Sequence, residues 1–95
     1  MENPWDTYIK EGNLEIIQYL HKNNIECPAE FIIVKDYEYG SAMDYAARNG
    51  HLEIVKYLHE NKLAKCTEQA MDCASENGHL KVFKYIRGFV SILDE

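Results

Sequence analysis

The sequence contains a segment that occurs three times, and this repetition constrains the fold more than any other feature. The copies align on a glycine and read GNLEIIQYLH from Gly12, GHLEIVKYLH from Gly50 and GHLKVFKYIR from Gly78. The eight residues before each glycine also correspond, as PWDTYIKE, AMDYAARN and AMDCASEN. A unit of this size cannot bury its apolar side chains alone, so the repeat predicts copies stacked in a row, each covering the next.

Each unit is predicted to form two helices. Asn3, Ser41 and Thr67 stand before the first helix of each unit, where a side-chain oxygen can accept a hydrogen bond from a free backbone N–H. Asp6 and Asp44 follow Asn3 and Ser41 by three residues, which is the spacing of a capping box with Asp in place of Glu. The aligned glycine then ends the first helix, because glycine adopts a positive φ at little steric cost.

The second helix of each unit has apolar side chains at helical spacing. In the three units these are Leu14, Ile16, Ile17 and Leu20; Leu52, Ile54, Val55 and Leu58; and Leu80, Val82, Phe83 and Ile86. The first helices carry small residues instead, Ala46, Ala47 and Ala74, which allow neighbouring helices to approach closely. The expected fold is therefore all-α, with three stacked helix-turn-helix repeats that form a short solenoid.

The connection between the first two units is longer than the connection between the last two. The aligned glycines are 38 residues apart in the first case and 28 in the second, so about ten additional residues lie between His21 and Ala42. The β-branched run FIIV at residues 31–34, followed by KDYEYG, favours a loop or hairpin finger over residues 28–40. An extra helical turn that begins at Pro28 is the alternative, because CPAE resembles the CTEQ at the start of the third unit.

These patterns divide the 95 residues into the parts of a single domain. The first repeat covers about residues 3–24 and the insert-bearing connection residues 25–40. The second repeat covers about residues 41–62, the third about 67–88, and a C-terminal tail residues 89–95. The first repeat has Trp5 where the others have Met43 and Met71, and we expect it to cap the array.

Composition argues against several classes of function. No run approaches the roughly 18 apolar residues of a membrane span, and the N-terminus lacks the basic start and apolar centre of a signal peptide. The net charge is −6, most of it carried by residues 1–41. This negative charge argues against nucleic acid as a partner, because phosphates attract clustered Lys and Arg. It either serves solubility or forms a surface suited to a basic protein partner. Three cysteines cannot all pair within the chain, which fits a reducing, intracellular and cytoplasmic location.

The histidines and cysteines lack the spacing of a metal or catalytic site. Zinc ligands usually include close pairs such as C-x2-C or H-x3-H, whereas Cys66 and Cys73 are seven residues apart. A catalytic nucleophile needs a base oriented toward it. The residues around Cys66 and Cys73 are explained by the repeat pattern, and none of them is placed as such a base. The repeat explains the histidines: His51 and His79 share the turn position, and His21 and His59 share a late position of the second helix. We expect no metal, no cofactor and no enzymatic activity.

A tyrosine recurs late in the second helix of every unit, at Tyr19, Tyr57 and Tyr85. The first interpretation is a packing ladder, in which each ring fills the groove between units and its hydroxyl stays at the surface. A binding stripe on the convex face is the alternative.

The segment AMDYAARNGHLEIVKYLHENK resembles the ankyrin repeat, whose units combine an Ala-Ala pair, Asn-Gly-His-Leu-Glu and an apolar second helix. The matching residues of the second unit are Ala46, Ala47, Asn49, Gly50, His51, Leu52, Glu53, Val55 and Leu58. The start SAMD replaces the family's Thr-Pro-Leu-His, and the 28-residue step is shorter than the family's usual 33 or so. In both departures the chain resembles the divergent ankyrin arrays of amoebae, oomycetes and giant viruses.

The resemblance implies an adaptor that binds another protein through the concave face of the solenoid and the insertion at 31–40, in the manner of host–pathogen interaction proteins. In the family, the partner-facing positions lie at the end of the first helix and in the loop before it. Here they correspond to Tyr37, Tyr39, Lys10, Arg48, Asn49, Glu68, Glu76 and Asn77. Tyr37, Tyr39 and Arg48 are the first expected anchors, because Tyr and Arg are enriched in binding hot spots.

The C-terminal segment RGFVSILDE leaves two alternatives open. Its apolar residues Phe89, Val90, Ile92 and Leu93 either fold back as a cap on the third repeat or form a patch for self-association or a partner. A monomer is expected. The alternative is a homodimer through Phe89, Ile92 and Leu93, and the corresponding function is that of a self-associating building block.

Overall fold

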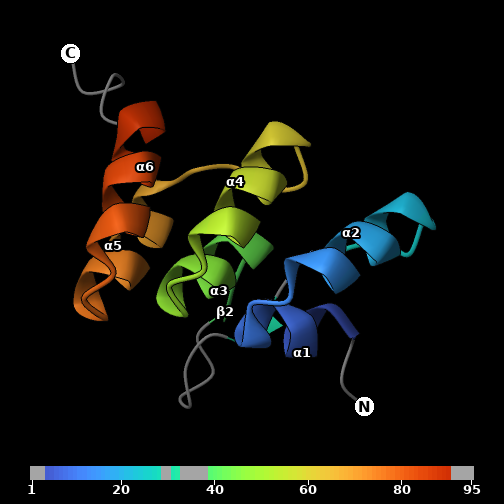
Figure 1. Ribbon diagram of the computed structural model, residues 1–95. Helices are drawn as coiled ribbons and strands as arrows, with labels where there is room; N and C mark the ends of the chain where they lie inside the picture. The colour runs from blue at the N-terminus through green and yellow to red at the C-terminus, as the bar shows by residue number, and fades with distance from the viewer. Residues whose placement is uncertain (1–3, 29–30, 33–38, 91–95) are drawn as a thin grey trace.

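The computed structural model describes residues 4–28, 31–32 and 39–90, and within these ranges the three repeats each form a pair of helices (Figure 1). Repeat one contains α1 (Pro4–Glu11) and α2 (Leu14–Lys22). Repeat two contains α3 (Ala42–Arg48) and α4 (Leu52–Glu60), and repeat three contains α5 (Glu68–Glu76) and α6 (Leu80–Val90). The prediction of an all-α solenoid of three helix-turn-helix units is confirmed.

The first helices begin and end where the sequence predicted. The side chain of Ser41 accepts a hydrogen bond from the backbone N–H of Asp44, and the Asp44 carboxylate accepts one from the N–H of Ser41 at 2.8 Å, which completes a capping box. Thr67 caps α5 by accepting from the N–H of Ala70 at 3.1 Å. Asn3, the third predicted cap, lies outside the described residues. The first helices stop at glycines with φ between +76° and +79°.

The helices form two layers (Figure 1). The first helices α1, α3 and α5 lie side by side in one layer, and the second helices α2, α4 and α6 form the other. Ala46, Ala47 and Ala74 are fully buried, so the small side chains allow α3 and α5 to approach closely, as predicted. The core also holds Trp5 and Met43, both with no exposed surface. The molecule is elongated, with extents of 39, 30 and 19 Å.

Successive repeats are joined by contacts between a tyrosine of one repeat and a histidine of the repeat before it. The hydroxyl of Tyr57 contacts Nδ1 of His21 at 2.6 Å, and the hydroxyl of Tyr85 contacts Nδ1 of His59 at 3.0 Å. Of the predicted ladder, Tyr57 and Tyr85 therefore lie between units, with their hydroxyls paired to histidines instead of remaining at the surface. Tyr19, in the first repeat, is 62% exposed. His51 adds a second link, because its Nε2 lies 2.8 Å from the carbonyl oxygen of Lys10.

The insertion between repeats one and two contains a small antiparallel hairpin. Its strands are β1 (Phe31–Ile32) and β2 (Tyr39–Gly40), with Phe31 opposite Gly40 and Ile32 opposite Tyr39. Both strands contact α3. Pro28 is not helical, so the structure supports the finger and not the extra helical turn. Residues 33–38 lie outside the described part of the chain.

The last helix is longer than its counterparts. Whereas α2 and α4 end before Asn23 and Asn61, α6 continues through Phe89 and Val90, which the sequence analysis assigned to the tail. Val90 is buried against the core and Phe89 is 45% exposed. Ile92 and Leu93 lie outside the described residues. None of the helices described is both long and apolar enough to cross a membrane.

Candidate functional site

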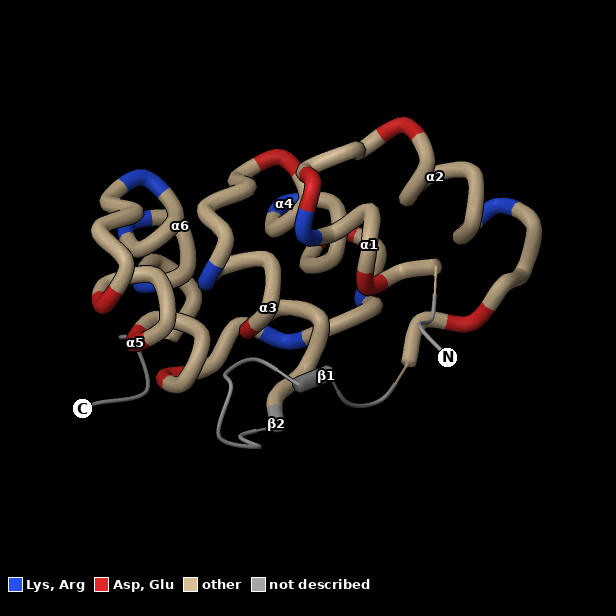
Figure 2. The backbone as a smooth tube through the Cα atoms, turned by 90° about the horizontal axis from the view of Figure 1, so that it is seen from below, with Lys and Arg blue, Asp and Glu red and all other residues tan. Residues whose placement is uncertain are grey.

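Three predicted partner-binding residues occupy equivalent places near the C-terminal ends of the first helices. Lys10 in α1 and Glu76 in α5 are exposed, and Arg48 in α3 is half-buried. Because the first helices lie side by side (Figure 2), these three residues occupy one edge of that layer. Within the described part of the chain these side chains form no hydrogen bond with other residues. The edge therefore presents two cations and an anion that the fold itself does not use.

Asn49 and Asn77 have a structural task that the sequence analysis did not foresee. Each follows a first helix, and its side-chain amide donates a hydrogen bond to a carbonyl four residues earlier, Asn49 to Tyr45 at 2.8 Å and Asn77 to Cys73 at 2.9 Å. Such bonds give a second donor to carbonyls in the last turn of a helix; the Tyr45 carbonyl, for example, also accepts from the backbone N–H of Asn49. Asn23 and Asn61 do the same for the second helices. The predicted role of Asn49 and Asn77 in partner binding stays a prediction.

Two of the remaining predicted residues, Tyr39 and Glu68, lie at the opposite ends of the first helices. Tyr39 belongs to β2, two residues before the capping residue of α3, and Glu68 is the exposed first residue of α5. Tyr37 lies outside the described residues. Since a helix rises about 1.5 Å per residue, the seven residues of α3 separate the two ends by roughly 10 Å. The predicted residues therefore bracket the layer of first helices and do not form one cluster.

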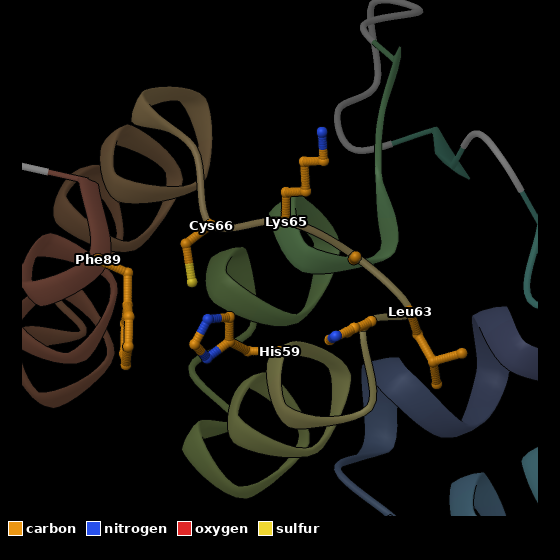
Figure 3. Close-up of a pocket in the computed structure, with 7 residues that line it drawn as sticks. His59, Leu63, Lys65, Cys66 and Phe89 are labelled. Carbon is orange, nitrogen blue, oxygen red and sulfur yellow. The ribbon is translucent and has the colours of Figure 1, made fainter. Parts of the chain in front are cut away.

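A surface hollow lies elsewhere among the described residues, between α4, the connection to α5, and the end of α6 (Figure 3). Its volume is about 620 Å³. It is lined by His59, Lys62, Leu63, Ala64, Lys65, Cys66 and Phe89. The side chains of His59, Cys66 and Phe89 surround the same space, whereas Lys65 points away from it. The ring centroids of His59 and Phe89 are 4.0 Å apart.

Sequence analysis missed this hollow, although one signal for it was present. The position that holds the capping residues Asn23 and Asn61 in the first two units is occupied by Phe89 in the third. Without an asparagine to close it, α6 continues and places an aromatic ring over His59. A break in the repeat at a capping position therefore predicts a local change of surface.

The thiols are suited to packing and not to nucleophilic chemistry. Burial raises the pKa of the Cys66 thiol, which lines the hollow. Burial, with the negative charge of Asp6, raises the pKa of Cys27 to about 11, and burial also raises the pKa of Cys73 to about 11. Nucleophilic cysteines have lowered pKa values, because the thiolate is the reactive species. Among the described residues, no group of three or more His, Cys, Asp or Glu side chains could hold a metal ion.

A comparison with protein-family models gives a match over most of the chain. Residues 7–90 match the family model of ankyrin repeats in three copies. No curated protein matches the chain.

Proposed function

Because the chain belongs to the ankyrin-repeat family, we propose that it is an adaptor that binds another protein through the layer of first helices and the hairpin. Ankyrin repeats are in general protein–protein interaction modules, not catalytic ones. In this chain the proposed surface is the concave face of the solenoid, bounded by the β1–β2 hairpin at one end of the first helices and by Lys10, Arg48 and Glu76 at the other.

The observation that carries the proposal is the contrast among side chains on this surface. The residues that recur as caps or inter-repeat contacts, such as Asn49 and His51, are engaged in the fold. Lys10, Arg48 and Glu76 occupy one repeat position yet differ in charge, and the fold gives them no hydrogen-bond partner within the described residues. A position that varies while its surroundings repeat is the place where a solenoid can encode a partner.

The charge of the chain favours a basic surface on the partner. Residues 1–41, which include repeat one and the hairpin, carry most of the net charge of −6. Opposite charges on two proteins accelerate their encounter and exclude other partners. We propose an intracellular setting for this interaction, and the similarity to amoebal, oomycete and giant-virus arrays favours a host protein as the partner.

The proposal is tested by affinity capture with quantitative mass spectrometry, comparing the wild-type chain with matched variants. Arg48→Ala with Glu76→Ala removes one cation and one anion from the proposed surface. Glu60→Ala with Lys62→Ala removes the same charges from the exposed end of α4, on the other layer. Tyr39→Ala tests the hairpin.

The expected result is a partner that both the wild type and the Glu60/Lys62 variant retain. We expect the Arg48/Glu76 variant and Tyr39→Ala to weaken its binding about tenfold or more, which corresponds to the loss of at least one hot spot of about 1.4 kcal/mol. Melting temperatures should barely change. Equal retention by all variants would contradict the proposed surface, and a large fall in melting temperature would identify the residues as packing residues.

Self-association through the C-terminal segment is the second candidate, favoured by the 45% exposure of Phe89. A large apolar ring left at the surface is a common feature of interaction sites. Sedimentation equilibrium of the wild type, Phe89→Asp and Leu93→Asp tests it. A dimer that both variants disrupt supports this candidate, and a monomer in all three removes it.

A further inference from the structure

Repeat three has a face on the side away from repeat two that no other described residue covers. We call it the end face and define it by Met71, Ser75, Gly78, Leu80 and Phe83. The equivalent residues of repeat two are Met43, Ala47, Gly50, Leu52 and Val55. There Met43, Ala47 and Val55 have no exposed surface, because repeat three covers them. In repeat three, by contrast, Ser75 and Gly78 are exposed and Leu80 is 60% exposed. Several positions that are buried in repeat two are therefore at least partly exposed on the end face of repeat three.

The end face also keeps a space that the other two interfaces fill. A Cβ atom on Gly12 would meet the ring of His51, and one on Gly50 would meet the ring of His79, so each glycine accommodates the turn residue of the next repeat. At the same position on Gly78, no atom of the described residues lies within 4 Å. A hollow of about 200 Å³ occurs here, lined by Ser75, Gly78, His79, Leu80 and Phe83. Its position is that of a missing turn residue.

Repeat one has the complementary face. Tyr19 is 62% exposed, whereas the equivalent Tyr57 and Tyr85 are half-buried against histidines of the preceding repeat. The turn position of repeat one holds Asn13, and Glu15 is exposed one helical turn before Tyr19. Residues four apart on a helix lie on the same side, so Glu15 and Tyr19 form an acidic and aromatic surface.

The charges and donors of α6 match this surface. Between Leu80 and Val90 the charged residues are Lys81, Lys84 and Arg87, with no Asp or Glu (Figure 2). Arg87 stands where His21 and His59 contact the tyrosine hydroxyls. Lys84 stands where Lys56 places its Nζ atom 5.9 Å from the ring centroid of Tyr85, within cation–π range. A tyrosine that docked here would meet the guanidinium of Arg87 and the ammonium group of Lys84, in a helix whose charges are all positive.

We propose that the end face of repeat three binds the face of repeat one that carries Tyr19 in a second copy of the chain, so that copies stack head to tail in the register of the repeats. Asn13 of the second copy then faces Gly78, as His51 faces Gly12, and Tyr19 lies over Lys84 and Arg87. The contact is heterologous, since each copy uses two different faces, so association continues beyond a dimer as concentration rises. It leaves the concave face free and does not depend on the function proposed above.

The experiment uses the whole chain and two variants that each disable one face. Leu80→Asp introduces a charge into the end face, at the start of α6, where an acidic residue is compatible with the helix dipole. Tyr19→Lys places a cation against Lys84 and Arg87 and is compatible with a helix. Both residues are about 60% exposed, so both variants should fold, as circular dichroism can verify.

Sedimentation velocity over a wide range of concentration should show growing oligomers for the wild type. Each variant alone should remain monomeric, with an association constant lower by about tenfold or more. An equimolar mixture should form a one-to-one dimer that grows no further, because one variant supplies an intact end face and the other an intact Tyr19 face. Phe89→Asp should associate as the wild type does.

Three results would overturn the proposal. These are a wild type that is monomeric at every concentration, variants that associate like the wild type, and a mixture of the two variants that remains monomeric. Loss of association in Phe89→Asp would assign it to the C-terminal segment instead.

Discussion

The hydroxyl of Tyr57 lies 2.6 Å from Nδ1 of His21, and the two residues are 36 positions apart in the chain. The equivalent pair in the next interface, Tyr85 and His59, is separated by only 26 positions, yet its rings meet at nearly the same angle, 81° against 82°. The difference of ten is the length of the insertion. The insertion therefore leaves the stacking unchanged, and the register between repeats one and two is the same as between two and three.

This pairing predicts a specific loss of stability on removal of one oxygen. Tyr57→Phe deletes the hydroxyl and leaves Nδ1 of the half-buried His21 without its partner. A typical intramolecular hydrogen bond contributes about 0.5–1.5 kcal/mol, so we expect the free energy of unfolding to fall by about 1 kcal/mol. Urea denaturation monitored by circular dichroism measures the change.

Tyr19→Phe is the matched control, because Tyr19 occupies the same repeat position and is 62% exposed. Its unfolding free energy at low protein concentration should stay within about 0.5 kcal/mol of the wild type. Equal losses in the two variants would show that the hydroxyl acts within its own helix and not between repeats.

A second prediction concerns Asp44, which is only 4% exposed and serves two repeats at once. Its carboxylate closes the capping box of α3 with Ser41 and accepts a hydrogen bond from the hydroxyl of Thr67, the cap of α5, at 3.4 Å. Loss of a cap costs about 1 kcal/mol. The backbone N–H of Ser41 and the hydroxyl of Thr67 also lose their acceptor, which adds to the cost. We expect Asp44→Ala to lower the unfolding free energy by about 1–3 kcal/mol.

Asp72 provides the comparison for Asp44. It holds the same place in repeat three, but it is exposed and lies five residues after the cap Thr67, beyond the capping-box position. Asp72→Ala should change the unfolding free energy by no more than about 0.5 kcal/mol. A large loss on this substitution would mean that the recurring aspartate acts through something other than the cap.

Much of this architecture could be predicted from the sequence because the governing interactions are local. The glycine stops and the caps Ser41 and Thr67 depend on residues within a few positions of one another, and repetition confirms each signal. The stacking of the units could also be predicted, because the apolar side of each unit is buried only when a neighbouring unit packs against it. Even the finger could be favoured over a helical turn, from the β-branched run at residues 31–34.

The parts that escaped prediction involve pairs whose partners lie in different units. A recurring Tyr and a recurring His are both visible in the sequence, but their spacing within one helix does not show that Tyr57 meets His21 of the unit before it. The hollow beside Phe89 likewise results from one missing asparagine and from the course of the chain between α4 and α5. Of the expected anchors, only Arg48 has a described side chain, and its binding role stays a prediction.

A third prediction separates two effects at the glycine stops. Gly50 and Gly78 both have φ of +76°, so alanine is strained equally at each. Only at Gly50 would the added Cβ also collide with a side chain, that of His79. We expect Gly78→Ala to lower the unfolding free energy by about 1 kcal/mol and Gly50→Ala to lower it by clearly more. Equal urea midpoints for the two variants would indicate that His79 moves away without cost.

The final prediction is that the free energy of unfolding falls at alkaline pH, and that part of this fall is due to Cys73. Burial, and then the nearby negative charge of Asp44, raises the pKa of this thiol from 9.0 to about 11 in the folded chain. Between pH 9 and 11 the unfolded thiol therefore loses its proton while the folded thiol retains it. Since the unfolded state binds fewer protons there, stability falls as pH rises. The contribution of the thiol is fully present below pH 9 and is lost as the pH approaches 11.

Tyrosines and lysines titrate in the same range, so the measurement must be differential. Urea unfolding of the wild type and of Cys73→Ala is compared at steps from pH 8 to pH 11. The wild type should lose more stability than the variant over this interval, because only the wild type must retain a proton on a buried thiol at position 73. Cys27, whose pKa is also raised to about 11, remains in both chains and cancels in the comparison. Parallel curves would show that the Cys73 thiol ionises as readily in the folded chain as in the unfolded one, which its 6% exposure argues against.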